Sequence, residues 1–242
     1  MAGVALLIDN VTVEFGAFRA IDALSLAIHF GEVRAVIGPN GAGKTTLLDV
    51  ISGIARPKQG RVIFDDAIDI TRASESVVAH AGIRRKFQKP SVFDGLSVRQ
   101  HIAIGAEGGL RSTLSRVTLA ERIDEVLEAV GLQDMAHRSA AELGHGHKQW
   151  LEIGMVLASN PKVVMLDEPV AGLSDDETER TAALVRNLKR SDRAIVVVEH
   201  DMDFVERIAD RVTVLHEGRT LFEGSMVNAR ADERVIDVYL GR

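Results

Sequence analysis

The 242-residue sequence contains no cysteine, which excludes a disulfide framework and any site in which thiolates bind a metal. Positive charge is also not in excess, because 29 Lys and Arg residues stand against 35 Asp and Glu residues, a net charge of −6. Such a chain has no overall attraction for nucleic acid or for anionic lipid. We therefore expect no nucleic-acid partner, and the absence of cysteine suits a reducing compartment.

Long apolar runs are missing as well. The longest ones, such as 163–166 and 194–198, are far shorter than the ~20 residues that a membrane-spanning helix needs. The first ten residues have no basic segment followed by a long apolar run, so they do not match a signal peptide. We expect a chain that stays inside the cell and reaches a membrane only through a partner.

The apolar content that is present, 46% of the residues, is enough for a sizeable core in one domain spanning 1–242. Apolar and polar side chains alternate over 24–30, the pattern of a half-buried strand, which together with 6–15 predicts an antiparallel sheet. The mostly apolar run 33–37, a glycine-rich loop and the helical pattern 44–51 predict strand, loop and helix.

Two later β-branched runs, 163–166 and 194–198, have the composition of parallel strands that are covered on both faces. Helical spacing of apolar residues occurs at 119–130 and 148–158, and 176–188 predicts a crossover helix between the last two strands. The fold class is therefore α/β, with a mostly helical subdomain inserted at about 89–158 into a parallel-sheet core.

The glycine-rich loop at 38–45 has the sequence Gly-Pro-Asn-Gly-Ala-Gly-Lys-Thr. Its glycines let backbone N–H groups turn toward phosphate oxygens, and the following helix presents its positive N-terminus. In this pattern Lys44 reaches the β- and γ-phosphates and Thr45 offers a hydroxyl to Mg²⁺. A plain glycine-rich turn is the alternative, and the strand before the loop and the helix after it favour phosphate binding.

An acidic pair, Asp167 and Glu168, follows the buried run 163–166. Carboxylates at the end of such a strand can divide two tasks, with Asp167 holding the Mg²⁺ shell and Glu168 polarising a water for attack on the γ-phosphate. An acidic pair that only complements a helix dipole is the alternative. The glycine-rich loop in the same chain favours the catalytic interpretation.

Five further residues can be interpreted only together with these motifs. His200, after the run 194–198, is a candidate donor to the γ-phosphate, although a lone histidine is more often a surface or capping residue. Gln88 is a candidate for orienting water or binding Mg²⁺, and Phe15 for stacking on adenine, against an exposed loop Gln and a core aromatic as the ordinary alternatives. His145 and His147 make a weak metal site, because no carboxylate or Cys supports them.

Together these residues resemble an ABC transporter ATP-binding subunit, over essentially the whole chain. In this resemblance 38–45 is the Walker A motif and the run through Asp167 is Walker B. Gln88 corresponds to the Q-loop, His200 to the switch histidine and 143–147 to the signature.

The resemblance implies a P-loop NTPase with a RecA-like core, an N-terminal antiparallel β-subdomain and an inserted helical subdomain. It implies that the helical subdomain carries the signature and contacts two membrane permease subunits. A second, homologous ATPase subunit would form a head-to-tail dimer around two ATP molecules, and an extracytoplasmic solute-binding protein would take part indirectly. The chain would then lie peripherally on the cytoplasmic face of the inner membrane.

The expected cofactors are ATP and Mg²⁺. Catalysis is expected of Glu168, His200 and Gln88, and Mg²⁺ binding of Thr45, Gln88 and Asp167. Residues expected to contact the nucleotide are Phe15, Gly38, Pro39, Asn40, Gly41, Ala42, Gly43, Lys44, Thr45, Thr46, Gly144, His145, Gly146 and His147.

Shorter segments resemble the branched-chain amino acid and urea importers in particular, namely 168–173, 198–202 and 235–241. Segment 148–154 is most similar to the first ATP-binding subunit of the urea importer. The sequence therefore predicts urea ahead of branched-chain amino acids as the solute.

The sequence departs from the family pattern where the usual signature serine and glutamine are Gly144 and His147, and where Ser174 replaces a frequent Asp. A degenerate, binding-only subunit is one alternative, which the intact catalytic set opposes: Lys44, Asp167, Glu168 and His200. A soluble ABC ATPase that acts on ribosomes or DNA is another. Such proteins usually carry two cassettes or long coiled-coil insertions, and the sequence has neither.

Overall fold

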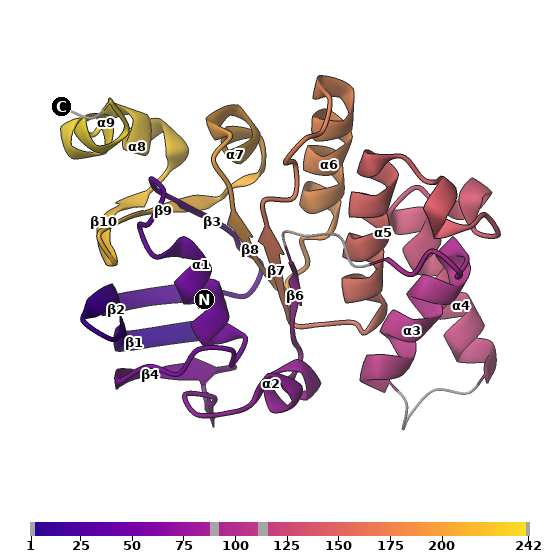
Figure 1. The fold of residues 1–242 in the computed structure, drawn as a ribbon, viewed down its shortest axis with the longest axis horizontal. Coiled ribbons are helices and arrows are strands. Elements are labelled where there is room, and N and C mark those ends of the chain that lie inside the picture. Colours follow the sequence, from indigo (N-terminus) through magenta and orange to yellow (C-terminus); the bar gives the residue numbers. More distant parts are fainter. Residues whose placement is uncertain (1–2, 88–91, 111–115, 241–242) are drawn as a thin grey trace.

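A computed structural model describes residues 3–87, 92–110 and 116–240. Figure 1 shows two sheets with a separate group of helices to one side. Sheet A is antiparallel, with strand order β2-β1-β4-β5, and contains β1 (Val4–Phe15), β2 (Phe18–His29), β4 (Gln59–Phe64) and β5 (Ile68–Asp69).

Sheet B has the order β10-β9-β3-β8-β7-β6, and its strands are parallel except for the pair β10 and β9. Its members are β3 (Val33–Ile37), β6 (Ile83–Lys86), β7 (Val163–Asp167), β8 (Ala194–Val198), β9 (Arg211–His216) and β10 (Arg219–Gly224). Because the strands run parallel, the loops after β3, β6, β7 and β8 leave the sheet at one edge, which is where a ligand is bound in such sheets.

Helices cover both faces of sheet B (Figure 1). Those in the described residues are α1 (Lys44–Ile51), α2 (Glu75–Ala81), α3 (Val98–Leu110), α4 (Arg116–Ala129), α5 (His145–Ala158), α6 (Asp175–Asn187), α7 (Met202–Ile208), α8 (Met226–Ala231) and α9 (Glu233–Leu240). Two short 3₁₀ turns, Gln133–Met135 and Ala140–Glu142, connect α4 to α5.

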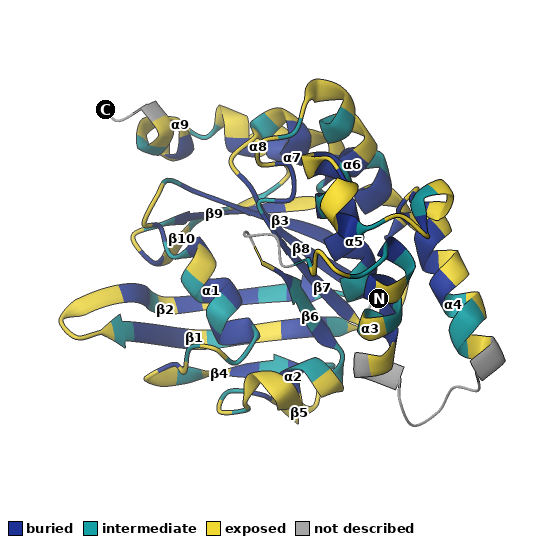
Figure 2. Cartoon of the chain, turned by 45° about the vertical axis from the view of Figure 1, so that its right-hand side comes forward, coloured by how far each residue is buried: buried dark blue, intermediate teal, exposed yellow. Residues whose placement is uncertain are grey.

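Burial explains the largely apolar runs of the central strands, which are dark blue in Figure 2. Along β7, Val164 and Leu166 pack in the cluster that includes the helices α3 to α6, while Val163 and Met165 pack in the cluster formed with α1 and sheet A. Successive side chains of a strand point to opposite faces, so a strand covered on both faces is apolar at most positions. Arg34 in β3 is a buried exception, and it pairs with Glu32.

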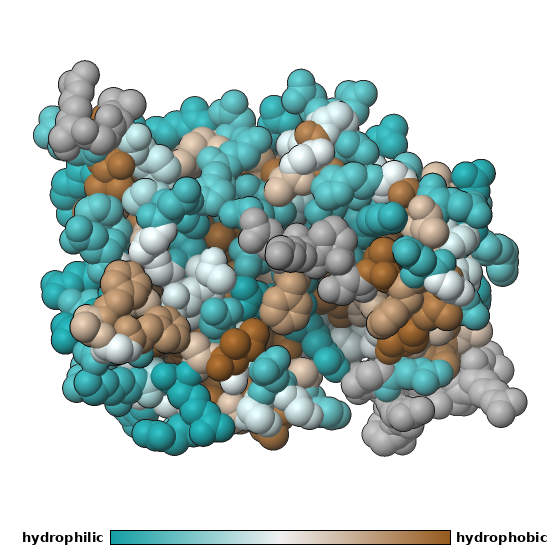
Figure 3. Space-filling model, in the orientation of Figure 1, coloured by the Kyte–Doolittle hydropathy of each residue, from teal (hydrophilic) through white to brown (hydrophobic). Residues whose placement is uncertain are grey.

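The predicted elements are found with small shifts. The antiparallel pair is longer than expected, and the helix predicted at 148–158 begins at His145, because the glycine and histidine residues before Lys148 carry no apolar pattern. The predicted inserted helical subdomain is confirmed in its described part, where α3, α4 and α5 pack together. Figure 3 shows apolar surface over this group, and Ile104 is one of its exposed apolar side chains.

Within the described ranges, no helix is both long enough and apolar enough to cross a bilayer.

Candidate nucleotide site

The glycine-rich loop connects β3 to α1 and has the backbone that its glycines predict. Gly38 has φ +151° and Gly43 has φ +101°, both in the region that disfavours side chains. A Cβ on Gly38 would collide with the carbonyl oxygen of Leu215, and one on Gly43 would lie 2.7 Å from the carbonyl oxygen of Ala20. The sequence requirement at these two positions is therefore steric.

Lys44 begins α1 and folds back over the loop. Its Nζ donates to the carbonyl oxygens of Gly38, at 2.7 Å, and Pro39, at 3.0 Å. Burial lowers the pKa of the Lys44 ammonium, and the carboxylates of Glu168 and Asp167 oppose this shift. A phosphate would replace these carbonyls as a stronger, charged partner. Asn40 and Thr45 have exposed side chains and Thr46 is half-buried.

Asp167 and Glu168 lie at the end of β7, and β8 separates this strand from β3 in the sheet order. Asp167 is 4% exposed, and its Oδ2 accepts a hydrogen bond from Nη2 of Arg85 at 2.7 Å. Glu168 has φ +47°, an unusual value for a residue with a side chain, and its N–H donates to the carbonyl oxygen of Val198 at 2.9 Å. The strained backbone of Glu168 sets the direction of its side chain at the end of the strand, and such strain is common at active sites.

His200 lies directly against Glu168. Its Nε2 is 2.8 Å from Oε1 of Glu168, and because a carboxylate only accepts, this nitrogen carries the hydrogen. The sequence predicted contact of His200 with a γ-phosphate, whereas the structure pairs it with the carboxylate expected to act on water. The two groups thus form one unit at adjacent strand ends.

Sequence reasoning missed Glu199, which fixes that unit. Its carboxylate accepts from the N–H of Val170 at 3.1 Å and from the N–H of His200 at 2.9 Å. Burial raises the pKa of the Glu199 carboxyl, and those N–H groups oppose the shift. Glu199 therefore joins the end of β8 to the loop that follows Glu168. Its acidic side chain after an apolar strand was the available signal.

The signature residues lie at the start of α5, with Gly144 as its N-cap. The two histidines contact different neighbours: His145 Nε2 is 3.0 Å from the carbonyl oxygen of Ala171, and His147 packs edge-on against Trp150, with ring centroids 5.2 Å apart. A Cβ on Gly146 would collide with the Glu177 carboxylate.

That carboxylate is itself held in place. Ser174 caps α6, its Oγ accepting from the N–H of Glu177, while Oε2 of Glu177 accepts from the N–H of Ser174 at 3.0 Å. Ser174 therefore fills the capping role at a position where the family often has Asp, which is an equally good cap.

Two predicted residues remain outside this network. Phe15 ends β1 opposite Phe18, and both side chains are more than half exposed, so stacking of Phe15 on a base remains a prediction. Gln88 lies outside the described residues. Among the described residues, no group of three or more His, Cys, Asp and Glu side chains could hold a metal by itself.

Oxygen atoms at the loop nevertheless suit Mg²⁺. This ion prefers oxygen ligands and usually takes only one or two carboxylates together with substrate phosphates. Asp167 contributes a buried carboxylate and Thr45 an exposed hydroxyl, so these two residues would hold the ion beside a bound triphosphate. There the ion would neutralise charge on the phosphates.

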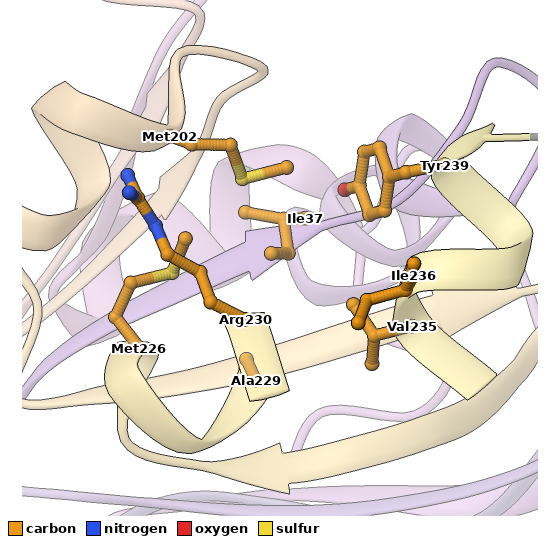
Figure 4. A pocket seen from close by; sticks show the side chains of 8 residues that line it. All are labelled: Ile37, Met202, Met226, Ala229, Arg230, Val235, Ile236 and Tyr239. Atoms are coloured by element: carbon orange, nitrogen blue, oxygen red, sulfur yellow. The ribbon is translucent and has the colours of Figure 1, made fainter. Parts of the chain in front are cut away.

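An apolar pocket of about 320 Å³ lies next to the loop rather than in it (Figure 4). Its lining comes from β3, α7, α8 and α9 and consists of Ile37, Met202, Met226, Ala229, Arg230, Val235, Ile236 and Tyr239. Arg230, the charged member, is paired with Asp203 at 2.7 Å. The other lining residues offer no charge to a phosphate, and the glycine-rich loop is the better site for a nucleotide.

Tyr239 connects this pocket to the glycine-rich loop. Burial raises the pKa of Tyr239 to about 12, and the nearby backbone of Gly38 opposes this shift. The C-terminal helix α9 thus supports the first residue of the loop.

The fold and this arrangement define a P-loop ATPase. The profile described as ABC transporter matches residues 21–171. LivG of Escherichia coli K12, a high-affinity branched-chain amino acid transport ATP-binding protein, is 33% identical over 249 residues, covering 98% of this chain and 97% of LivG. The probable LivG of Methanocaldococcus jannaschii is 32% identical over 247 residues, covering 96% of each chain.

An arabinose import ATP-binding protein of Burkholderia ambifaria, AraG 2, is 33% identical over 99% of this chain, which matches 46% of AraG 2. Among solved structures, a nucleotide-free ATP-binding cassette of an ABC transporter superposes with a TM-score of 0.87 at 30% identity, covering 99% and 100% of the two chains. A dimeric cassette in a post-hydrolysis state with ADP and Pi gives 0.79 at 25% identity, covering 91% and 98%. This chain belongs to the ABC transporter ATP-binding family, and it is an ATPase.

Proposed function

We propose that this chain is the ATP-hydrolysing subunit of an importer of small polar solutes, acting peripherally at the cytoplasmic face of the membrane. One observation carries the proposal: the glycine-rich loop, Asp167 with Glu168, and His200 follow the neighbouring parallel strands β3, β7 and β8. Each group has the chemistry that hydrolysis of a bound triphosphate needs, and together they support Mg-ATP as the substrate.

In the proposed reaction Lys44 binds the β- and γ-phosphates, and Thr45 and Asp167 hold Mg²⁺. The Glu168 carboxylate takes a proton from water as the water oxygen bonds to the γ-phosphorus, and the bond from that phosphorus to the β–γ bridging oxygen breaks. His200 holds Glu168 in place through the 2.8 Å contact. ADP and phosphate leave.

The proposed assembly has two permease subunits, a second ATPase subunit and, outside the membrane, a solute-binding protein. The dimeric relative with ADP and Pi supports pairing of cassettes. In that dimer the α5 N-terminus at Gly144 would face a nucleotide on the partner subunit, where a helix N-terminus can bind phosphate.

For the solute we propose urea, on the likeness of segment 148–154 to the urea importer subunit. Branched-chain amino acids are the second candidate, which the two LivG relatives support at about one-third identity over nearly full length.

Uptake into proteoliposomes distinguishes these solutes. The chain, its permeases and its second ATPase would be reconstituted together, with binding protein and labelled urea or leucine supplied on the opposite side. We expect ATP-dependent uptake of urea and none with Glu168→Gln. Uptake of leucine alone would replace urea by the second candidate, and ATP-independent or absent uptake of both would contradict the importer function.

A further inference from the structure

Arg85, on β6, lies in the site, although the sequence analysis assigned no role to it. Its side chain is 4% exposed and bridges two carboxylates: Nη1 is 2.6 Å from Oδ1 of Asp49, and Nη2 is 2.7 Å from Oδ2 of Asp167. Asp49 belongs to α1 and Asp167 ends β7. The guanidinium also lies over the ring of Phe87, 4.9 Å from its centroid.

These contacts have the geometry of an orienting group. A guanidinium stays protonated in proteins and presents its N–H groups in a rigid fork, so each carboxylate it binds is held in position as well as neutralised. Buried charge without partners is costly, and Asp49 and Asp167 supply them here. Arg85 therefore fixes the Oδ2 side of Asp167, and Oδ1 is the other oxygen of that carboxylate.

The second carboxylate extends this effect to the loop. Asp49 lies four residues after Thr45 in α1, and residues four apart lie on the same face of a helix. A bridge from Asp49 through Arg85 to Asp167 thus ties the helix face that carries the Thr45 hydroxyl to the end of β7. These are the two elements whose oxygens are expected at Mg²⁺.

We propose that Arg85 is a positioning residue for the magnesium site, acting through Asp167 and, by way of Asp49, on the helix that carries Thr45. The inference rests on the proposed role of Asp167 in holding Mg²⁺. Residues that orient metal ligands typically change metal affinity 10–100-fold when they are removed. A cation that merely occupies the metal position has the opposite effect, because its removal tightens metal binding.

Metal binding can be measured without turnover. Mn²⁺ would replace Mg²⁺, and free Mn²⁺ would be followed by electron paramagnetic resonance in the presence of the full chain and AMP-PNP. We expect Arg85→Gln to weaken Mn²⁺ binding roughly 10- to 100-fold, and Arg85→Lys to weaken it less, because a lysine keeps the charge and loses the fork. Binding of AMP-PNP in EDTA should stay unchanged.

Arg84→Gln is the matched control, since it removes the same group from the adjacent position, whose side chain points to the other face of the strand. Asp167→Asn tests the role on which the inference rests. If Asp167→Asn leaves Mn²⁺ affinity unchanged, the proposed metal role of Asp167 is wrong.

If Asp167→Asn weakens Mn²⁺ binding and Arg85→Gln leaves it unchanged or tightens it, the positioning role of Arg85 is overturned. Should Arg85→Gln not fold, Asp49→Asn decides the question, because it keeps Arg85 on Asp167 and frees α1. Weaker Mn²⁺ binding in that variant supports the bridge, and wild-type affinity refutes it.

Discussion

Glu168 and His200 lie 2.8 Å apart, and substitution of Glu168 tests the proposed reaction most directly. Glu168→Gln keeps the size of the side chain and removes the base, so we expect nucleotide binding to persist while hydrolysis falls about 10²- to 10⁴-fold. Lys44→Ala should instead weaken nucleotide binding, because it removes the phosphate-binding ammonium. Both variants are to be measured in the assembled transporter, and wild-type turnover by Glu168→Gln would show that another group takes the proton.

Glu199 gives a pH dependence of stability. Because burial raises the pKa of its carboxyl above the ordinary 4.5, the folded chain holds this proton more tightly than the unfolded chain does. The contribution of Glu199 to the free energy of unfolding is therefore largest below that ordinary value and declines as pH rises through the folded pKa.

Urea unfolding of wild type and Glu199→Gln, measured from pH 4 to pH 8, tests this sign. Wild type should lose stability relative to Glu199→Gln as pH increases over that range. If the difference in free energy of unfolding between the two proteins stayed constant over this pH range, the raised pKa of Glu199 would be contradicted.

At the same scale, the sequence predicted Lys44, Asp167, Glu168 and His200 because each belongs to a local pattern beside an apolar strand. Arg85 has no such pattern. It lies in Ile-Arg-Arg-Lys, a stretch too polar to predict a buried strand, and its two partners are distant in sequence. Only the pairing of β6 with β7 brings Arg85 to Asp167.

Between elements, a buried ion pair connects β6 to α5. Lys86 Nζ is 3.8 Å from Oε2 of Glu152, and both residues are buried. Burial lowers the pKa of the Lys86 ammonium, and Glu152 is the first of the carboxylates that oppose this. The pair thus links β6, the last strand in the order of sheet B, to the helix that starts at the signature.

Removing one partner leaves the other charge buried, which typically costs 3–5 kcal/mol. We therefore expect Glu152→Leu to lower the free energy of unfolding by about that amount, and the double variant Lys86→Met with Glu152→Leu to recover most of it. Chemical denaturation of the three proteins measures the recovery. Equal losses in the single and double variants would show that the pair itself is not what stabilises this contact.

The elements that the sequence predicted best are those with a strong period or a largely apolar run, such as β3, β7, β8 and α6. Those that it missed, among them β6, β9 and β10, have apolar residues interrupted by polar ones and gain their structure from neighbours in the sheet. The order of the strands likewise comes from pairing between distant segments, which local patterns do not encode.

For the whole molecule, the proposed assembly predicts that turnover depends on partners. The isolated chain should hydrolyse ATP slowly and become fast in a complex with two permease chains and a second ATPase subunit, because the partner would complete each nucleotide site. Co-purification from membranes and ATPase assays of both forms test this. Full activity of the chain alone, with none recovered in membranes, would contradict the proposal.

The altered signature predicts two unequal ATP sites in a heterodimer. Gly144 cannot donate the hydroxyl hydrogen bond that a serine would make, and a charge-assisted hydrogen bond contributes roughly 1.5–3 kcal/mol. The structure directs His145 to the Ala171 carbonyl, so it does not replace that donor in this conformation. We expect Gly144→Ser to speed the site formed with the partner's phosphate loop.

Turnover of each site would be measured with the other silenced by a general-base substitution. A bridging water in place of the hydroxyl would make the asymmetry small. No gain from Gly144→Ser, together with no loss from His147→Ala, would show that the signature substitutions are neutral.

The position of β3 in the sheet also determines when, during synthesis, this strand can pair with its neighbours. Its two hydrogen-bonded neighbours are β8 and β9, which begin at residues 194 and 211, so the strand that leads into the glycine-rich loop emerges long before either. Synthesis proceeds at about 5–20 residues per second, which separates β3 from β8 by roughly 8–30 s. Throughout that interval β3 lacks both of its hydrogen-bonded partners, and the glycine-rich loop is not yet held beside His200 at the end of β8.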